Sequence, residues 1–597
     1  MARRLPALLP LLALLAGCFP PQPREEDPRW ADGPAVTFPA RKGGRGPSAP
    51  APLLLPPAAP SFEAFLALPE ARMDPALGAL LFAAEDVPDF PREPFLRAID
   101  EMAREIRERS GGEKGENLLD HINQYLYFDH GFRYDPQDPH GVLPDNLYLH
   151  RVLRRKKGYC VSLGVLYLSI GKRLGLPLYG VRIPSHFIVR YDDGKVAKNV
   201  ETTDFGIPHP DAYYVTKYRI APDSIRRGVY LKNLTLRQVF ADLYNNRGTL
   251  RGVRGDWPGA LRALERGLVL DPVSPYLHYN RGVLLGRTDR EAEAEAEFAK
   301  AIALDPNHYY AVNNLAEIHS RRGEFDRALE EVNRALEIHP EYSNGYLNRG
   351  AILQRMGKAE AAAKNIDRAI ELDARNALAY IFRARILREK RDFLHAVHDL
   401  NRAVGADPLE PQAWAERGYT YLAMDRADKA LPDFDKALEL APGVVEYRLN
   451  RGVARLKAGN RAGARADFDE AVRAEPGRPE PLLNSAVLAL LEKRYADALA
   501  DLDRALEAAP GQPLVLVKRG LALLGLGRAG DAEADLLRAE GLAPGLAEIQ
   551  KQLGALYSDA GDRARAVLHL RRFLELEKGE DPAGRARAEA MLKEAGG

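Results

Sequence analysis

The sequence predicts an α+β domain followed by a long all-α solenoid, so the chain is expected to be mostly α-helical. From about residue 241 onward the residues recur with a period of 34. The preceding segment, Ser61 to about Leu236, lacks this period and has the length of one compact domain. Apolar residues make up 46% and charged residues 28% of the 597 residues, which is typical of soluble globular protein.

Charge and cysteine content exclude several classes of function. Lysine and arginine number 85 and aspartate and glutamate 84, a net charge of +1, so no concentrated positive surface for nucleic acid is expected. Cys18 and Cys160 are the two cysteines of the chain. This count excludes a disulfide-stapled fold, a cysteine-rich zinc site and an iron–sulfur cluster.

Residues 1–18 have the features of an export signal. A short basic stretch precedes an apolar run over Leu5–Leu15, which is too short to span a bilayer as a mature helix. The string Leu15-Ala16-Gly17-Cys18 resembles the bacterial lipobox, whose cysteine is acylated and becomes the N-terminus. We therefore expect a lipoprotein anchored through Cys18 in the bacterial envelope. Phe19 favours the periplasmic side of the outer membrane by analogy with enterobacterial sorting. The alternative is an ordinary signal peptide with a coincidental cysteine.

Residues 19–60 are rich in proline, including Pro20-Pro21, Pro56-Pro57 and the run over Pro47–Pro52. Proline removes backbone donors and favours the extended polyproline conformation, so this segment cannot build a core. We interpret it as a semi-rigid tether that holds the following domain away from the membrane. A proline-rich ligand for another domain is the alternative.

Three columns of residues define ten repeats between about Ala241 and Gly579. One column holds proline, with Ala374 in the missing slot: Pro272, Pro306, Pro340, Pro408, Pro442, Pro476, Pro510 and Pro544. A second is unbroken alanine: Ala260, Ala294, Ala328, Ala362, Ala396, Ala430, Ala464, Ala498, Ala532 and Ala566. A third holds only glycine or alanine: Gly248, Gly282, Ala316, Gly350, Ala384, Gly418, Gly452, Ala486, Gly520 and Gly554.

Small residues at two fixed points let two antiparallel helices approach closely, and the proline ends the second helix. In period, small-residue columns and terminal proline the array resembles the tetratricopeptide (TPR) repeat. The polar segment 580–597 is predicted to be a solvent-facing capping helix, which the open end of a solenoid requires.

Two further columns of the repeat carry polar residues. Asparagine stands two residues before the small residue at Asn246, Asn280, Asn314, Asn348, Asn450 and Asn484. In tetratricopeptide families that position faces the concave groove, so we expect these amides to bind the backbone of extended peptide partners. The alternative is a solvated helix face.

A neighbouring column holds arginine, and each arginine has a carboxylate sixteen residues further on. This spacing predicts ion pairs within each hairpin: Arg281–Glu297, Arg383–Asp399, Arg417–Asp433, Arg451–Asp467 and Arg519–Asp535.

The chemistry-bearing residues lie in the α+β segment 61–236. After Gly158-Tyr159-Cys160, apolar residues recur at helical spacing until Gly175 and Pro177, so Cys160 is predicted to open a helix. At that place the unpaired backbone N–H groups and the helix dipole favour a thiolate and can stabilise an oxyanion.

Two strand-like runs follow, Leu178–Tyr191 and Lys195–Thr203, with Asp193-Gly194 as a two-residue hairpin turn between them. This register pairs His186 directly with Glu201 across the two strands. A carboxylate beside an imidazole fixes its tautomer and supports the imidazolium that forms when it takes a thiol proton.

The strings Gly158-Tyr159-Cys160, Ser185-His186-Phe187-Ile188-Val189 and Asn199-Val200-Glu201-Thr202-Thr203 are similar to those of transglutaminase-like domains of papain-like fold. The resemblance covers roughly Leu118 to Gly206 and is strongest to the short bacterial branch often fused to tetratricopeptide repeats. It implies a Cys–His–acid site at Cys160, His186 and Glu201. Glu201 departs from the family pattern, which usually has aspartate there.

A buried structural cysteine and a structural strand histidine are the alternatives to this site. No P-loop, HExxH or GxSxG string occurs, and His130, His140, His150 and His209 lack metal-ligand spacing, so we expect neither a metal nor a nucleotide cofactor. The predicted function is acyl transfer on peptide or protein amides, and the resemblance favours hydrolysis over cross-linking. The alternative is a non-catalytic repeat scaffold with a degenerate thiol domain.

Overall fold

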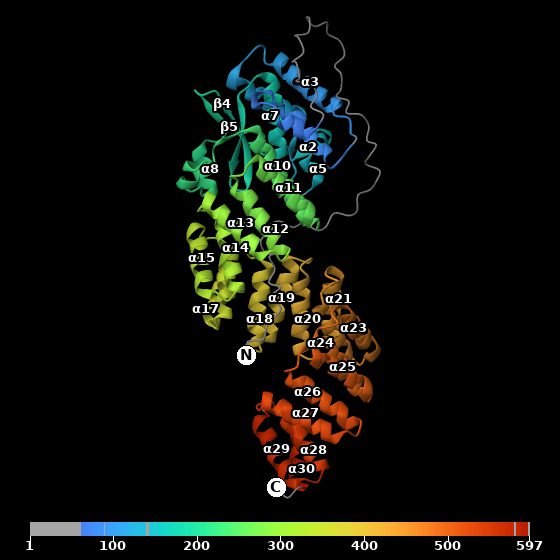
Figure 1. The fold of residues 1–597 in the computed structure, drawn as a ribbon. Helices are drawn as coiled ribbons and strands as arrows, with labels where there is room; N and C mark the ends of the chain where they lie inside the picture. Colours follow the sequence, from blue (N-terminus) through green and yellow to red (C-terminus); the bar gives the residue numbers. More distant parts are fainter. Residues whose placement is uncertain (1–60, 89, 139–142, 578, 580, 595–597) are drawn as a thin grey trace. The chain divides into compact units, whose positions relative to one another are not determined.

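Figure 1 shows the computed structural model, which describes residues 61–88, 90–138, 143–577, 579 and 581–594. The signal peptide, Cys18 and the tether predicted from the sequence lie outside the described residues. The chain divides into two compact units, one through Asn365 and the other from Ile366 to Gly597. Among the described helices, none has both the length and the apolar character needed to cross a membrane.

The first unit opens with an α+β part of mostly short elements. They are, in chain order, α1 (Phe62–Leu66), η3 (Glu70–Arg72), α2 (Pro75–Ala84), α3 (Glu93–Arg109), η4 (Gly115–Asn117), α4 (Leu118–Asn123), η5 (Gln124–Asp129), β1 (Arg133–Tyr134), α5 (Pro144–Leu147), α6 (Leu149–Arg155), β2 (Lys157–Gly158), α7 (Cys160–Leu174), β3 (Leu178–Ile183), β4 (His186–Asp192), β5 (Ala197–Val200), α8 (Asp211–Tyr218), α9 (Pro222–Arg226) and β6 (Asn233–Leu234).

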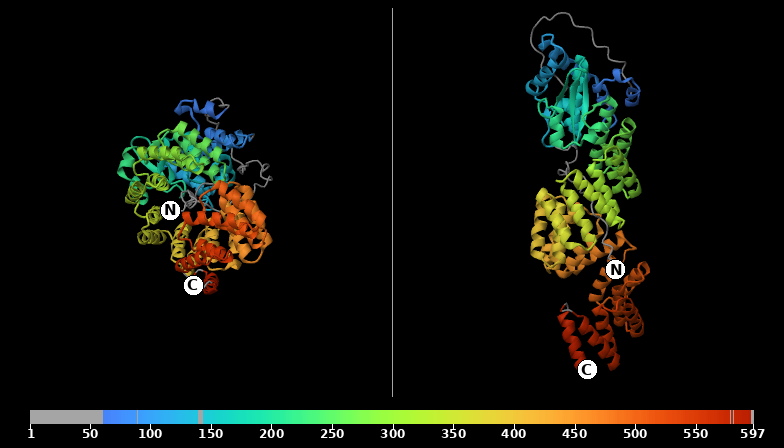
Figure 2. Two further views of the ribbon diagram at one scale, coloured as in Figure 1. Left: turned by 60° about the horizontal axis from the view of Figure 1, so that its bottom comes forward. Right: turned by 90° about the vertical axis from the view of Figure 1, so that its left-hand side faces the viewer.

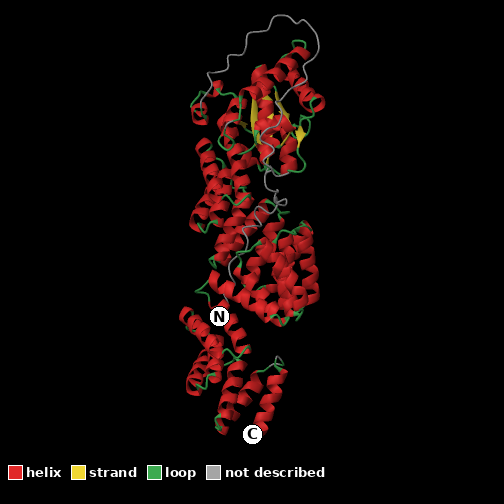
Figure 3. Cartoon of the chain, turned by 90° about the vertical axis from the view of Figure 1, so that its right-hand side faces the viewer, coloured by secondary structure: helices red, strands yellow, loops and turns green. Residues whose placement is uncertain are grey.

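Four of the strands form one antiparallel sheet in the order β5-β4-β3-β6, and β1 pairs with β2 in parallel. All of these strands, yellow in Figure 3, lie in the α+β part. Helix α7 packs against the sheet, where Gly164 lies so close to the Phe187 ring that a Cβ there would overlap it. The sequence therefore places a glycine where helix and sheet approach each other closely.

The hairpin register differs from the sequence-based expectation. The predicted strand Leu178–Tyr191 is in fact two strands, β3 and β4, joined by a tight turn at Pro184-Ser185 in which Ser185 has φ 55°. The expected two-residue turn at Asp193-Gly194 is wrong, because Asp192 pairs with Ala197 across a four-residue loop. The Asp193 carboxylate lengthens this loop by accepting hydrogen bonds from the backbone N–H groups of Lys195 (2.9 Å) and Val196 (2.8 Å).

Paired helices follow to the end of the chain, and Figure 2 shows the array from two further sides. They are α10 (Leu236–Val253), α11 (Trp257–Leu270), α12 (Pro275–Arg287), α13 (Glu291–Leu304), α14 (Tyr309–Arg321), α15 (Phe325–Ile338), α16 (Ser343–Arg355), α17 (Ala359–Leu372), α18 (Ala377–Glu389), α19 (Phe393–Ala406), α20 (Pro411–Ala423), α21 (Ala427–Leu440), α22 (Val445–Lys457), α23 (Arg461–Ala474), α24 (Pro479–Leu491), α25 (Tyr495–Ala508), α26 (Pro513–Gly525), α27 (Ala529–Leu542), α28 (Ala547–Asp559), α29 (Arg563–Leu576) and α30 (Pro582–Glu594).

The small-residue columns lie where the helices of each pair touch. Every alanine of the unbroken column is 0–1% exposed. In the glycine column, a Cβ at Gly418 would come within 2.9 Å of the Phe434 ring on the second helix of the same repeat. Both columns therefore set the distance between helices, as expected from the sequence.

The arginine column forms the predicted ion pairs. Each predicted pair is present, with N–O distances of 2.7 to 3.2 Å. Several of these arginines also contact an acid sixteen residues earlier, as Arg451 contacts Asp435 at 2.9 Å. The column therefore joins neighbouring repeats as well as the two helices of one hairpin.

Helix α10 belongs to both the repeat array and the core of the α+β part. The Phe240 ring packs edge-to-face on Phe62 with centroids 5.4 Å apart, and Tyr244 packs on Phe82 at 5.0 Å. All four aromatic side chains are buried in one hydrophobic core. The first repeat is thus part of the α+β core rather than attached to it by a linker.

Candidate functional site

Cys160 is the first residue of α7, as the spacing of apolar residues predicted. The start of the helix is held by Ser162, whose Oγ accepts a hydrogen bond from the Tyr159 backbone N–H at 3.1 Å. Gly158 fits tightly before it, since a Cβ at this position would lie 2.8 Å from the Ser162 Oγ. Cys160 itself is a free, half-buried thiol at a helix end whose first N–H groups have no intrahelical partner.

His186 opens β4 and lies against Glu201, which follows the last residue of β5. Its Nε2 is 2.8 Å from one carboxylate oxygen of Glu201 and 3.0 Å from the other. Since Val189 pairs with Val200, Glu201 is level with Ile188, two residues from His186. A shift of two residues keeps the same face of a sheet, so the two side chains are diagonal neighbours.

The Glu201 carboxylate is held from two other sides. Thr203 donates to Oε1 from its hydroxyl at 2.6 Å and from its backbone N–H at 3.3 Å. The hydroxyl of buried Tyr214, on α8, donates to Oε2 at 3.5 Å. Glu201 is 7% exposed, so these bonds replace water around its charge.

Electrostatics favour an imidazolium–carboxylate pair. Burial acts to lower the pKa of His186, but hydrogen bonds and charge interactions with Cys160 and Glu201 outweigh it and raise this pKa well above 6.5. Burial acts to raise the pKa of Glu201, and the interactions with His186 and Thr203 lower it below 4.5 instead. His186 therefore interacts with both Cys160 and Glu201.

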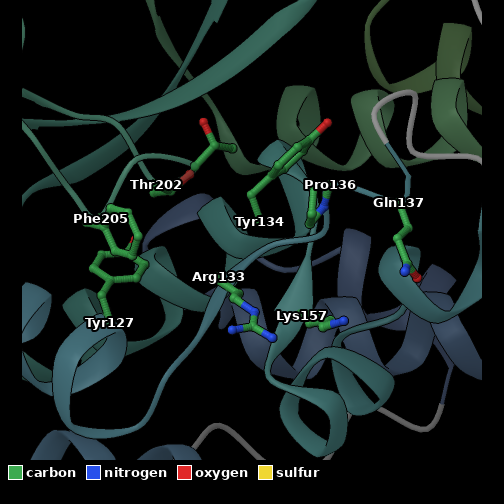
Figure 4. Close-up of a pocket in the computed structure, with 9 residues that line it drawn as sticks. Tyr127, Arg133, Tyr134, Pro136, Gln137, Lys157, Thr202 and Phe205 are labelled. Atoms are coloured by element: carbon green, nitrogen blue, oxygen red, sulfur yellow. The ribbon is translucent and has the colours of Figure 1, made fainter.

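A pocket of about 380 Å³ is lined in part by residues close to Cys160 and Glu201 in the sequence (Figure 4). Its lining includes Thr202 and Thr203, which follow Glu201, and Lys157, which lies three residues before Cys160. The remaining lining residues are Tyr127, Arg133, Tyr134, Pro136, Gln137 and Phe205. The sequence reasoning missed this pocket because β1 and β2 are two residues each, too short to leave a pattern.

The asparagines of the predicted groove all lie on the first helix of their repeats, but their surroundings differ. Asn246 donates to the Tyr159 hydroxyl at 2.6 Å, which ties α10 to the residue before Cys160. Asn280 donates to Asn245 at 2.7 Å, and Asn450 donates to the Glu446 carbonyl of its own helix at 2.8 Å. Asn314 is buried, whereas Asn348 and Asn484 are half-buried.

Two hydrogen bonds of the candidate site were not foreseen from the sequence. Tyr214 donates to Glu201 and Asn246 donates to Tyr159, and no local pattern marks either bond. Among the described residues, no three or more histidine, cysteine, aspartate or glutamate side chains are grouped so that they could hold a metal ion.

Comparison with known proteins matches two kinds of domain. The profile of the transglutaminase-like superfamily matches residues 93–239. Profiles of the tetratricopeptide repeat match residues 245–308, 288–347, 343–376, 383–445 and 449–513.

Among curated proteins, a UPF0162 protein of Pseudomonas aeruginosa is 28% identical over 211 residues, which cover 34% of this chain and 75% of that protein. F-box only protein 21 of Mus musculus is 37% identical over 115 residues, 19% of this chain and 17% of that protein. The chain thus spans three quarters of the first relative and less than a fifth of the second.

Among solved structures, yeast Tom70 matches 60% of this chain and 96% of its own at 16% identity with a TM-score of 0.35. The protein YrrB, described as a TPR protein with an unusual peptide-binding site, matches 32% of this chain and 97% of its own at 24% identity with a TM-score of 0.27.

Proposed function

Because residues 93–239 form a domain of the transglutaminase-like superfamily and tetratricopeptide repeats follow it, we propose that this protein is a thiol enzyme that transfers acyl groups from peptide or protein amides. Cys160 is the nucleophile, His186 the acid and base, and Glu201 the residue that orients His186. Hydrolysis, with water as the acceptor, is the favoured outcome. The repeats hold the protein substrate or other protein partners.

The observation that carries this proposal is the contact of His186 Nε2 with Glu201 at 2.8 Å. It leaves Nδ1 as the ring nitrogen available to the thiol of Cys160. In the resting pair His186 is an imidazolium that holds the proton on Nδ1, and the Cys160 sulfur attacks the carbonyl carbon of the amide as a thiolate. The C–N bond then breaks, and the leaving amine takes the proton from Nδ1.

The resulting thioester is resolved by the same groups. His186 accepts a proton from water, the oxygen attacks the acyl carbon, and the C–S bond breaks to release the carboxylic acid and Cys160. If an amine attacks instead, the product is a cross-link. The unpaired N–H groups at the start of α7 are suitable donors for the oxyanion of both steps.

The test is the rate of Cys160 alkylation by iodoacetamide near neutral pH, with free cysteine as the reference. We expect the full chain to react far faster than free cysteine, His186→Ala to lose that advantage, and Glu201→Gln to lose most of it. His209→Ala is the matched control, because this histidine stacks on Tyr213 at 3.9 Å and does not belong to the proposed site. Equal rates in wild type and His186→Ala would favour the alternative, a non-catalytic repeat scaffold.

The proposed docking groove is also open to a direct test. Asn348 and Asn484 are half-buried on the first helices of their repeats, α16 and α24, so a double change to alanine removes two partly exposed amides. We expect weaker binding of protein substrates and an unchanged rate of iodoacetamide reaction at Cys160. Asn450→Ala is the control, because its amide already bonds its own helix. Equal substrate binding in all variants would show that these amides do not dock the substrate.

The proposal includes the location of the protein. The string that ends at Cys18 supports a lipid anchor in the bacterial envelope, with the proline-rich segment as the tether. Substrates would then be envelope proteins or peptides that reach the anchored domain.

A further inference from the structure

Two cations lie side by side in the pocket lined by Thr202 and Thr203. Arg133 on β1 is the register partner of Lys157 on β2, so the two side chains come from adjacent positions of neighbouring strands. Both line the pocket, and Figure 4 shows them next to each other. Like charges on directly paired strand positions repel each other unless an anion lies between or beside them.

One carboxylate partly neutralises this pair. Asp135 is fully buried and pairs with both Arg155, at 3.2 Å, and the Nζ of Lys157, at 3.9 Å, so Lys157 shares it with a second cation. The ion pairs of Asp135 go to Arg155 and Lys157, and among the described residues none is found for Arg133. Glu201 is engaged by His186. The pocket therefore carries an excess of positive charge.

Other lining groups fit a ligand with one charged end and an apolar body. Thr202 is 0% exposed and its hydroxyl oxygen has no hydrogen-bond partner, although buried polar atoms are nearly always paired. Tyr127 and Phe205 pack edge-to-face with centroids 6.2 Å apart on another side of the pocket. Phe128, next to Phe205 at 6.0 Å, is 65% exposed and extends this apolar surface.

We infer that this pocket is a substrate subsite that binds a carboxylate, with Arg133 and Lys157 as its charge partners and the Thr202 hydroxyl as an additional donor. The inference rests on the proposed function, because it makes acidic peptides the preferred substrates of the Cys160 site. The carboxylate belongs either to an acidic side chain or to a chain terminus. Arginine and lysine bind both through charge-assisted hydrogen bonds.

The experiment compares three electrophiles of nearly equal size on the full chain. N-chloroacetyl-glutamine amide is neutral, N-chloroacetyl-glutamic acid α-amide has a side-chain carboxylate, and N-chloroacetyl-glutamine has a terminal carboxylate. The measured quantity is the rate of Cys160 alkylation by each charged probe divided by the rate with the neutral probe. The same ratio for free cysteine is the reference.

In wild type we expect one of the charged probes to react at least about tenfold faster than the neutral probe, relative to free cysteine. The faster probe identifies the source of the carboxylate. Arg133→Gln and Lys157→Gln should each reduce the ratio toward that of free cysteine, and Thr202→Val should reduce it while Thr202→Ser preserves it. Lys195→Gln is the matched control, because this exposed lysine lies in the β4–β5 loop and does not line the pocket.

The two proposals fail separately. A ratio equal to that of free cysteine in wild type, or the same ratio in wild type and in folded Arg133→Gln and Lys157→Gln proteins, overturns the carboxylate subsite. The absolute rate with the neutral probe tests the proposed activation of Cys160 independently. A slow neutral rate with a preserved charge preference would thus keep the subsite and reject the activated thiol.

Discussion

The length of the Glu201 side chain matches the diagonal position from which it contacts His186. Its carboxylate is 2.8 Å from Nε2 even though the backbone of Glu201 lies beyond the end of β5. Aspartate would keep the charge but place it one methylene further away. The glutamate that departs from the family pattern therefore suits the register of this hairpin.

Glu201→Asp should consequently slow Cys160 alkylation by iodoacetamide about tenfold or more, because a charge-assisted hydrogen bond to the imidazole is lost. Thr203→Val, which removes only a hydroxyl bond to the same carboxylate, should have a smaller effect. An unchanged rate in Glu201→Asp would mean that the reach of the side chain is not what positions His186.

The His186–Glu201 pair should also make stability depend on pH. The pKa of His186 is raised above 6.5 in the fold, so its contribution is fully present below pH 6.5 and is lost as the pH rises through the raised value. The pKa of Glu201 is lowered below 4.5, so its contribution is present above pH 4.5 and is lost as the pH falls. The contribution of the pair is thus greatest between pH 4.5 and 6.5.

We expect the difference in free energy of unfolding between wild type and Glu201→Gln to be largest in that window and smaller on both sides. Urea titration at a series of pH values measures it. A difference that does not change with pH would show that the two groups do not interact as charges.

At the scale of elements, the arginine column stabilises the contact between the two helices of a repeat. Arg417, on α20, contacts both oxygens of Asp433 on α21, at 2.9 and 2.7 Å. The Asp433 side chain is 3% exposed, and burial raises its pKa although Arg417 acts to lower it. The Arg417 guanidinium therefore stabilises the buried carboxylate of Asp433.

Arg417→Ala should therefore destabilise the protein by about 3 kcal/mol, since it leaves a buried carboxylate without its partner. The loss should shrink toward acidic pH, because protonation removes the uncompensated charge and the pKa of Asp433 is already raised. Arg426→Ala is the control, because Arg426 pairs with Asp428 on the exposed surface, and no measurable change is expected there. Thermal unfolding of both variants measures this difference in stability. Equal melting temperatures would contradict the expected destabilisation by Arg417→Ala.

At the scale of the whole molecule, α10 makes the α+β part and the first repeats one folding unit. The division of the chain into compact units falls after Asn365, well inside the repeat array, and not at the start of α10. Phe240 and Tyr244 supply part of the core that buries Phe62 and Phe82.

A chain shortened to end at Leu234 should therefore fail to unfold cooperatively, because it exposes the aromatic surface that α10 covers. A chain that ends at Ile338, after α15, keeps this helix and the repeats packed on it, and should unfold cooperatively. Circular dichroism during heating distinguishes the two. Cooperative unfolding of the shorter chain would show that the α+β part is independent of the repeats.

The proposed anchor predicts how the whole protein distributes between membrane and soluble fractions. Cys18→Ser should release it from bacterial membranes, because the acylated thiol is lost while the folded parts are unchanged. Fractionation after a high-salt wash measures this. Sedimentation of the variant with the membranes would reject lipid anchoring at Cys18.

The sequence by itself determined the features that depend on local or periodic patterns. The period of 34 was sufficient to predict the paired helices and the ion pairs sixteen residues apart, such as Arg417–Asp433. The helix that begins at Cys160 was equally predictable, since apolar spacing and Gly175 mark its two ends. Short-range preferences and repetition are read directly from the chain.

Only the tertiary structure decided the features that depend on long-range placement. The Asp193 carboxylate lengthened the loop and shifted the register by two residues, and the reach of Glu201 restored the contact with His186. The pairing of Arg133 with Lys157 and the packing of α10 onto Phe62 join segments far apart in the chain. Such contacts arise from packing of the whole core, because no local preference of the residues involved specifies their partners.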